Sequence, residues 1–193
     1  MLEMEVQTKG AEKLQRIAYA VGAVMEGDFI LSSGKKSGRY FEGKKLTLWP
    51  EGAVAVGEAV CELLESVKVD AIGGLAEGAS PIVAAVAVVS QQMGDPIPSF
   101  IVREQKKEHG TQRRVEGYLE RGWRVVVIDD VVTLGGSTWK AIEAVEAMGC
   151  QVVKVIAIVD RHEGGSDSIR NAGYDFAAFL GFRVGLESDN ECC

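Results

Sequence analysis

The most constraining feature of the sequence is the stretch 124–143, where an apolar run, two acids, a glycine-rich turn and a helical pattern follow one another. Four consecutive β-branched residues, Val125 to Ile128, predict a strand that is buried on both faces. Asp129 and Asp130 follow this run, and the turn 133–138 leads into the helical pattern. Backbone N–H groups of such a turn suit a phosphate group, while paired carboxylates offer acceptors to sugar hydroxyls or charge to a metal.

Strand and helix patterns alternate along most of the chain. Continuous apolar strands that alternate with helices predict an α/β fold, in which a central parallel sheet is flanked by helices on both faces. In such a sheet, ligands bind at the carboxyl ends of the strands. The expected strands are 71–75, 99–102, 124–129, 152–160 and 176–180, with short ones at 29–31 and 39–41; the expected helices are 9–24, 50–67, 78–93 and 136–148, with a short one after residue 160; and the expected ligand-facing segments are 75–81, 103–110, 129–138 and 160–165.

Length and charge limit the class of protein. The 193 residues suffice for one domain with a sizeable core, and a net charge of −7 argues against general binding to nucleic acid or an anionic membrane. No run reaches about 18 apolar residues. No pair of the four cysteines has the spacing of metal ligands. We therefore expect a protein of the reducing cytoplasm that binds neither nucleic acid nor membrane.

The polar stretch 103–114 carries five Lys or Arg residues and two Glu residues, a local charge of +3. It is either a solvated loop or a lid over an anion, since a long polar loop at the ligand end of a sheet is typical of a lid. Closure of a lid brings cations to a developing negative charge and removes water. His109, one of two histidines in the chain, lies in this stretch and could serve as a donor or acid.

Two further segments carry weaker signals. Residues 27–41 combine aromatic side chains with lysines and serines, and form either a surface hairpin or a hood over a flat anionic ring. Arg161 directly follows a strand end, and is either a surface arginine paired with Asp160 or Glu163 or a guanidinium that forks onto a ligand carboxylate. The chain has neither the P-loop nor the dinucleotide-binding glycine pattern, so those two nucleotide-binding classes lose their main support.

Taken together, these residues resemble a known family. The segment 126–137 resembles the PRPP-binding signature of type I phosphoribosyltransferases. The segments 29–37, 102–110 and 160–164 are similar to those of the orotate phosphoribosyltransferase family, and residues 73–82 occupy the place of the family's glycine-rich pyrophosphate loop. The resemblance runs from about residue 11 to 182, and the lid and 160–164 patterns are more specific than the PRPP signature.

The resemblance implies a single phosphoribosyltransferase domain over residues 1–193, of the type I phosphoribosyltransferase fold, with an N-terminal hood at about 25–48 and a disordered tail from about 187. It implies transfer of the 5-phosphoribosyl group of PRPP to N1 of orotate, which gives orotidine 5′-monophosphate and pyrophosphate in de novo UMP biosynthesis. It also implies Mg²⁺, held largely by PRPP oxygens with no direct protein ligand. The implied active unit is a homodimer whose lid residues act in the neighbouring site.

Roles for individual residues follow from the same resemblance. Asp129 and Asp130 would hold the ribose hydroxyls beside an oxocarbenium-like transition state, and Lys107 and His109 would be the catalytic residues that meet the pyrophosphate. Arg161 would meet orotate. The implied PRPP-binding set is Arg103, Lys106, Lys107, His109, Asp129, Asp130, Val131, Val132, Thr133, Leu134, Gly135, Gly136 and Ser137, and the implied orotate-binding set is Ser32, Lys36, Phe41, Thr133 and Arg161.

The chain departs from the family pattern at two positions. Relatives usually carry Lys directly after the lid arginine, where this chain has Glu104, and a carboxylate near pyrophosphate would repel it. Lys106, two positions on, offers a replacement charge, and Glu77 stands in a loop where many relatives have Lys. Two alternatives therefore stay open: a phosphoribosyltransferase for another base, and a non-catalytic PRPP-binding regulator on the same fold.

Overall fold

The computed structural model describes residues 3–4, 6–30, 36–104 and 114–181. The expected tail from about residue 187 and the central part of the expected lid lie outside these residues. Within them, none of the helices combines the length and the apolar character that a membrane crossing requires.

A seven-stranded sheet forms the centre of the molecule, with the strand order β1-β9-β8-β7-β4-β5-β6. The five inner strands run parallel, whereas the edge strands β1 and β6 are antiparallel to their neighbours. The predicted parallel sheet is therefore confirmed, and its two short antiparallel edges were not predicted. The strands are β1 Glu3–Met4, β4 Ala71–Leu75, β5 Ser99–Val102, β6 Val115–Gly117, β7 Arg124–Val132, β8 Gln151–Asp160 and β9 Phe176–Gly181.

Strand β7 is longer than the sequence pattern predicts. Its expected end was Asp129, but pairing with β8 continues through Val131 opposite Val159 and Val132 opposite Asp160. Both acids therefore lie inside the strand, whereas the pattern placed only Asp129 there. Because successive strand residues point to opposite faces of a sheet, neighbouring acids in a strand reach different surroundings.

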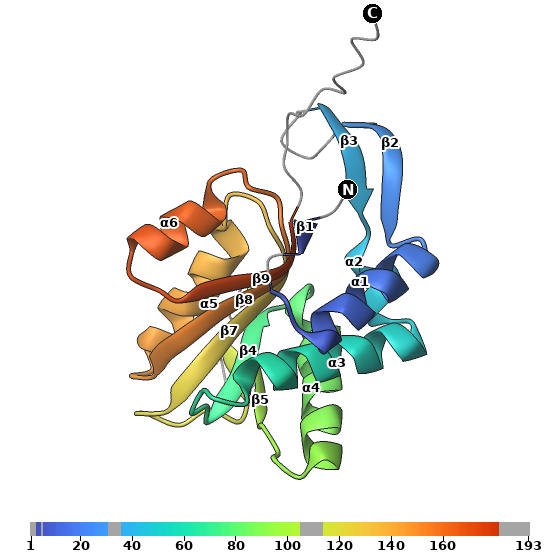
Figure 1. The fold of residues 1–193 in the computed structure, drawn as a ribbon. Coiled ribbons are helices and arrows are strands. Elements are labelled where there is room, and N and C mark those ends of the chain that lie inside the picture. Colours follow the sequence, from blue (N-terminus) through green and yellow to red (C-terminus); the bar gives the residue numbers. More distant parts are fainter. Residues whose placement is uncertain (1–2, 5, 31–35, 105–113, 182–193) are drawn as a thin grey trace, which may run out of the picture.

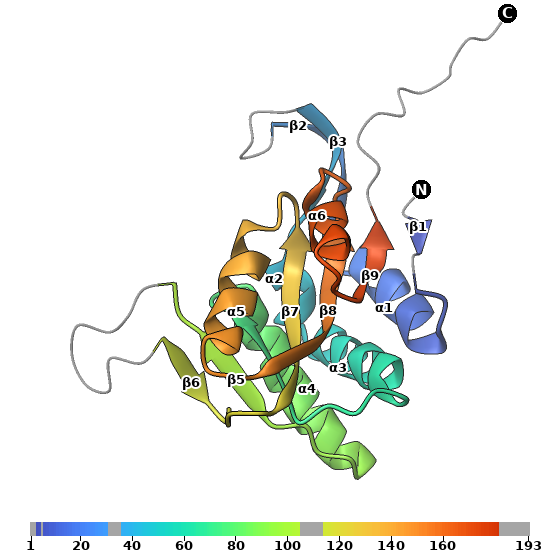
Figure 2. The same ribbon diagram turned by 90° about the vertical axis from the view of Figure 1, so that its left-hand side faces the viewer.

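Helices cover both faces of the sheet (Figures 1 and 2). Helices α1, α3 and α4 lie on one face, where they bury Val126 and Ile128, while α5 and α6 cover the other, where Val125 and Val127 are buried. This alternation along β7 is why its apolar run is continuous. The helices are α1 Lys9–Ala20, α2 Gly43–Thr47, α3 Pro50–Leu64, α4 Ala79–Met93, α5 Gly136–Glu146 and α6 Gly165–Asn171.

The N-terminal segment forms a separate two-stranded sheet of β2 Val24–Ile30 and antiparallel β3 Lys36–Phe41. The pairing is irregular between Glu26 and Phe29, which shifts the register along the hairpin. The hairpin projects from the end of the molecule toward which the arrowheads of β7 and β9 point (Figure 2). The segment expected as a hood thus lies at the carboxyl ends of the parallel strands, where ligands bind in such sheets.

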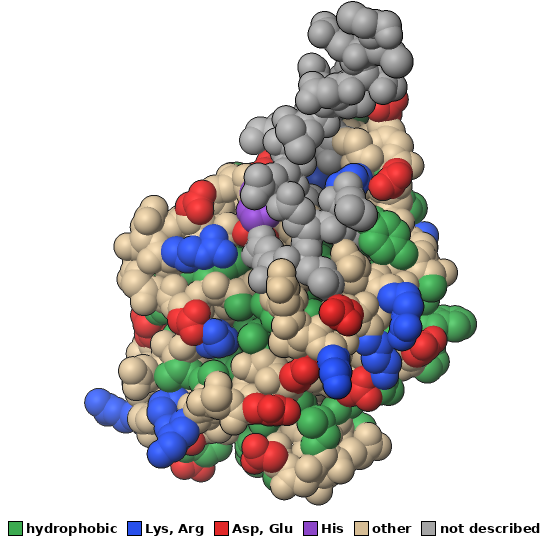
Figure 3. Space-filling view, viewed as in Figure 1, with side chains coloured by type: hydrophobic (Ala, Val, Ile, Leu, Met, Phe, Trp, Pro, Cys, Tyr) green, Lys and Arg blue, Asp and Glu red, His purple; other side chains and the backbone are tan. Residues whose placement is uncertain are grey.

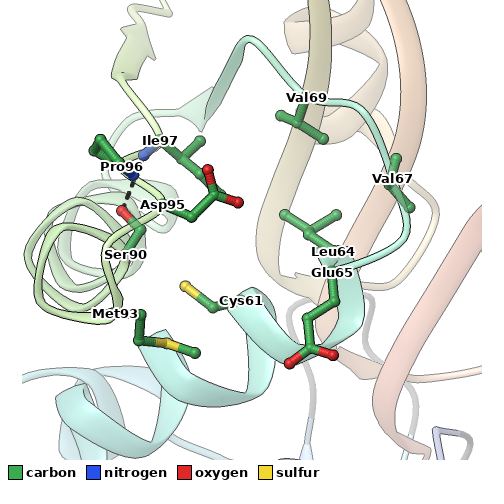
Figure 4. Close-up of a pocket in the computed structure, with 10 residues that line it drawn as sticks. All are labelled: Cys61, Leu64, Glu65, Val67, Val69, Ser90, Met93, Asp95, Pro96 and Ile97. Atoms are coloured by element: carbon green, nitrogen blue, oxygen red, sulfur yellow. Dashed lines mark hydrogen bonds between the residues drawn. The ribbon is translucent and has the colours of Figure 1, made fainter.

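A small cavity of about 130 Å³ lies near the C-terminal ends of α3 and α4, at the end of the molecule away from the hairpin (Figure 4). Its walls are mostly apolar, with the carboxylates of Glu65 and Asp95 among them. Burial raises the pKa of the Cys61 thiol in this cavity, and the nearby Asp95 carboxylate raises it further.

On the face that Figure 3 shows, acidic and basic side chains are interspersed.

Candidate active site

Asp129 is the most buried acid of the junction at the end of β7, with 4% of its surface exposed. Its Oδ2 accepts hydrogen bonds from the hydroxyls of Ser137 at 2.5 Å and Thr138 at 3.0 Å, and its Oδ1 accepts the backbone N–H of Asp130 at 3.1 Å. Burial raises the pKa of Asp129 to about 6; the hydroxyl and N–H bonds oppose this rise, and the Asp130 carboxylate adds to it. The sequence predicted this acid as a site residue, and in the structure its carboxylate is hydrogen-bonded to residues of β7 and α5.

Asp130 is half-buried, and its Oδ1 accepts the backbone N–H of Val131 at 2.9 Å. The loop that joins β4 to α4 passes directly over both acids at Gly78. A Cβ at Gly78 would lie 2.6 Å from Oδ1 of Asp130 and 3.3 Å from Oδ1 of Asp129. Only glycine lets the backbone approach so closely, so the expected ligand-facing segment 75–81 does reach the acids.

The turn 133–135 lies between β7 and α5, and its conformation depends on Gly135, which has a φ of +81°. Residues Gly136 to Thr138 form the first turn of α5, where backbone N–H groups have no partner within the helix. The carbonyl of Thr133 accepts the N–H of Gly165 at 3.0 Å, which ties the turn to the start of α6. This arrangement of N–H groups is the kind that binds phosphate.

Arg161 follows β8 and is buried, with 7% of its surface exposed. Its backbone N–H donates to the carbonyl of Val132 at 3.0 Å, so it stands beside the end of β7. Its Nε lies 3.4 Å from Oε1 of Glu163, whose side chain is only 2% exposed. Burial lowers the pKa of Arg161, while Glu163 and Tyr40 act to raise it. Arg161 is thus no surface arginine, although the pairing with Glu163 that the sequence left open is present.

The two neighbouring aromatic residues of β3 lie in different environments. Phe41, which the family resemblance places in the orotate-binding set, is 5% exposed and packs into the core with α1 and α3. Tyr40 is 39% exposed, and the centroid of its ring lies 5.6 Å from that of Phe29. Its electrostatic interaction with Arg161 acts to raise the pKa of the guanidinium. Strand alternation accounts for the difference, because consecutive side chains point to opposite faces. Ser32 lies outside the described residues, and for Lys36 only the backbone in β3 is described.

The start of the lid is described at Arg103 and Glu104, and each of these two residues forms an ion pair. Nη1 of Arg103 lies 3.1 Å from Oε2 of Glu116, on β6. Oε1 of Glu104 accepts a hydrogen bond from Nζ of Lys140 on α5 at 2.5 Å, and this lysine lowers the pKa of Glu104. The carboxylate that replaces the usual family lysine is therefore neutralised by a cation of the helix. Lys106, Lys107 and His109 lie outside the described residues.

Three residues near the site are absent from the predicted set of site residues: Thr138, Tyr40 and Glu163. Thr138 is the last residue of the predicted turn 133–138, so its position was expected but its contact with Asp129 was not. Tyr40 lies one residue from the predicted Phe41, and only the register of the hairpin decides which ring is exposed. Glu163 was considered only as the partner of a surface arginine, whereas its side chain is buried.

In this parallel sheet, the central strand β7 carries two adjacent acids and leads through a glycine-containing turn into α5. This arrangement is typical of type I phosphoribosyltransferases. Residues 42–172 match the family model of the phosphoribosyl transferase domain. The chain belongs to this family, and within it to the orotate phosphoribosyltransferases, as the relatives below show.

Curated relatives of this chain are orotate phosphoribosyltransferases, and the alignments cover most of their length. Orotate phosphoribosyltransferase of Nostoc sp. is 46% identical over 157 residues, which cover 81% of this chain and 76% of that protein. The enzyme of Aquifex aeolicus is 44% identical over 164 residues, 84% of this chain and 90% of that protein. A crystal structure of Mycobacterium tuberculosis orotate phosphoribosyltransferase in complex with PRPP is 29% identical, covers 90% of this chain and 96% of that chain, and superimposes with a TM-score of 0.73.

Proposed function

We propose that the chain transfers the 5-phosphoribosyl group of PRPP to N1 of orotate, giving orotidine 5′-monophosphate and pyrophosphate in pyrimidine biosynthesis. One observation carries the proposal: the N–H of Arg161 donates to the carbonyl of Val132 at 3.0 Å. This bond places the main chain of Arg161, whose side chain is buried, beside the end of β7, directly before the phosphate-type turn. A cation at that position suits a carboxylated base, and the turn suits the 5′-phosphate.

PRPP would occupy the end of β7 and the start of α5. The turn and the first helical turn would bind the 5′-phosphate, and Asp129 and Asp130 would accept the ribose hydroxyls from two sides. Gly78 brings the backbone of the β4–α4 loop close to both acids, so this loop would border the bound PRPP. The proposed contacts to PRPP along this stretch are Val131, Val132, Thr133, Leu134, Gly135, Gly136 and Ser137.

Orotate would lie between the turn and the hairpin. The guanidinium of Arg161 would bind the orotate carboxylate, with Glu163 fixing its orientation from the protein side. Thr133 would lie near the base. Because Phe41 is in the core, we assign the covering of the ring to Tyr40, and we propose that Ser32 and Lys36 close the same side.

The chemistry rests on position and charge rather than on a covalent intermediate. As pyrophosphate leaves, positive charge develops on the ribose, and the two carboxylates of β7 stabilise it. The lid residues Arg103, Lys106, Lys107 and His109 would close on the pyrophosphate and exclude water. Lys107 and His109 would neutralise the charge that the leaving group gains.

Mg²⁺ is the cofactor we propose, and the donor chemistry of the site fits it. Asp129 and Asp130 offer oxygen atoms, the type of ligand that Mg²⁺ prefers. Magnesium commonly enters such sites on substrate phosphates while it keeps several waters. The ion would be held by PRPP oxygens and would neutralise the pyrophosphate.

We also propose a homodimer in which the lid of each chain acts in the neighbouring site. The two ends of the lid leave the sheet at its edge, between β5 and β6, which is the geometry that a reach to a second molecule needs (Figure 2). For the compartment we propose the cytoplasm, where free thiols such as Cys61 and Cys150 stay reduced.

A substrate panel tests the function. The chain is incubated with PRPP and Mg²⁺ and with orotate, uracil or a purine base in turn, and the loss of orotate absorbance is followed. Turnover of orotate alone is the expected result. Turnover of a purine without orotate would refute the proposed substrate, and PRPP binding without turnover of any base would indicate a regulator. The pairing of Glu104 with Lys140 removes the main sequence feature that favoured a regulator.

A further inference from the structure

We propose that Thr138 is a positioning residue of the transfer reaction: it holds the carboxylate of Asp129 in place after the hydroxyl of Ser137 has turned to the 5′-phosphate. This inference rests on the proposed function. It concerns the residue that directly follows Ser137 in the first turn of α5.

Two hydroxyl groups converge on one oxygen of Asp129. The Ser137 hydroxyl lies 2.5 Å and the Thr138 hydroxyl 3.0 Å from Oδ2. A hydroxyl group has a single proton to donate, so Ser137 cannot serve a phosphate oxygen and Asp129 at the same time. Whichever hydroxyl serves the ligand leaves the carboxylate to the other.

Burial decides which of the two hydroxyls stays. Thr138 is 1% exposed and lies inside, between α5 and the sheet, whereas Ser137 is partly exposed in the same helical turn. The Thr138 side chain therefore has no route to a ligand on the surface. Once Ser137 has turned away, Thr138 is the remaining hydroxyl donor on Oδ2, and Oδ1 keeps the backbone N–H of Asp130.

The hydrogen bond from Thr138 affects the ionisation of Asp129 because this acid is buried. Burial is the main reason that the pKa of this acid rises, and the two hydroxyl donors are among the groups that hold the rise down. Loss of the Thr138 bond would therefore favour the protonated acid, which neither accepts a ribose hydroxyl fully nor stabilises positive charge.

The charged groups around Asp129 are few in the described part of the chain. From β7 itself, the carboxylate of Asp130 raises the pKa of Asp129. Helix α5 presents the two uncharged hydroxyls, and β8 presents Ala157 in register with Asp129. Two nearby charged side chains are held in ion pairs: Glu77 of the 76–78 loop pairs with Lys44, and Lys140 of α5 pairs with Glu104.

The test uses matched variants at the two hydroxyl positions. Thr138→Val keeps the shape and removes the hydroxyl, Thr138→Ser keeps the hydroxyl, and Ser137→Ala removes the other donor. For each, kcat and kcat/KM for PRPP are measured from pH 5 to 9, and PRPP binding is followed by calorimetry over the same range without any base. Circular dichroism checks the fold, and Thr138→Ala replaces the valine variant if that one does not fold.

In the pH profiles of kcat and of PRPP binding, the acid limb is the range in which activity or affinity falls as the pH is lowered. We expect Thr138→Val to move this limb upward by about one pH unit, because a hydrogen bond to a charged group is worth roughly that much. At a fixed pH on this limb, the shift is about a tenfold loss. Thr138→Ser should keep the wild-type limb, and Ser137→Ala should raise the KM for PRPP while the limb of kcat stays in place.

Two results would overturn the proposal: a valine variant whose limb coincides with wild type, or a serine variant with the same defect as valine, which would indicate packing alone. Failure of the proposed function would look different, because wild type would then bind PRPP and leave orotate unchanged while the binding limb still tests Thr138. A wild-type chain that binds no PRPP overturns both proposals.

Discussion

Replacement of Asp129 by asparagine should make the protein more stable at neutral pH and inactive in phosphoribosyl transfer. The carboxylate is 4% exposed, and its pKa in the folded protein is about 6, compared with 3.8 for an ordinary aspartate. A folded pKa that is raised means that the folded state holds the proton more tightly than the unfolded state. The contribution of Asp129 to stability is therefore greatest below pH 3.8 and is lost as the pH rises through about 6.

The magnitude follows from the shift. At about 1.4 kcal/mol per unit, the full cost of ionising Asp129 in the folded protein is about 3 kcal/mol, of which about 2 kcal/mol falls between pH 4.5 and 7.5. An asparagine side chain does not ionise and carries no such cost, which is why the Asp129→Asn variant should gain on wild type by about 2 kcal/mol across this range. Urea unfolding at four pH values and one fixed protein concentration measures the difference, and subtraction of wild type cancels the other titrating groups.

A matched control is Asp70→Asn. The ion pair and hydrogen bonds of Asp70 with Arg124 lower the pKa of Asp70, so its transition lies below 3.8. Its contribution to stability is present above that pH, and the difference between Asp70→Asn and wild type should stay constant from pH 4.5 to 7.5. The reasoning about Asp129 is refuted if the Asp129→Asn difference is also constant over this range.

The remaining predictions concern the lid and the base. Lys107→Ala should lower kcat by about 100-fold or more with an unchanged circular dichroism spectrum, and an unchanged kcat would remove the lid from the chemistry. Arg161→Ala should raise the KM for orotate by about tenfold or more and affect that for PRPP less, and equal changes in both would contradict a role at the base. Glu104→Gln should lower the KM for PRPP a few-fold in low salt, because it leaves the charge of Lys140 uncompensated. The double variant Glu104→Gln with Lys140→Gln should restore the wild-type KM. Absence of a salt-dependent effect would mean that the pair lies too far from bound PRPP to interact with it electrostatically.

The sheet was predictable because its strands carry their own signal. The apolar run of β7 and the expected limits of β4 and β5 needed only hydrophobic periodicity. Strand β6 was missed because Val115–Gly117 is three residues long and pairs only with the chain that returns from the lid. The extension of β7 to Val132 likewise depends on pairing with β8, which no local pattern reveals.

The site was predictable where its residues are neighbours in sequence and not where they meet in space. The acid pair, the turn and the start of α5 form one continuous segment, and the sequence identified all three. Which of Tyr40 and Phe41 faces outward depends on the register of a hairpin with an irregularity between Glu26 and Phe29. A one-residue shift in register exchanges the two faces, so residue type alone could not decide it.

The partner of Glu104 shows the same limit, and it changes the meaning of the departure from the family pattern. Glu104 and Lys140 are 36 positions apart, and only the fold brings them together. At the start of the lid, Glu104 is paired with Lys140 and Arg103 with Glu116. We therefore expect much of the positive charge at the pyrophosphate to come from residues 105–113, which carry three Lys or Arg and one Glu. Affinity for PRPP should accordingly depend strongly on Lys106 and Lys107 and only weakly on the residue at position 104.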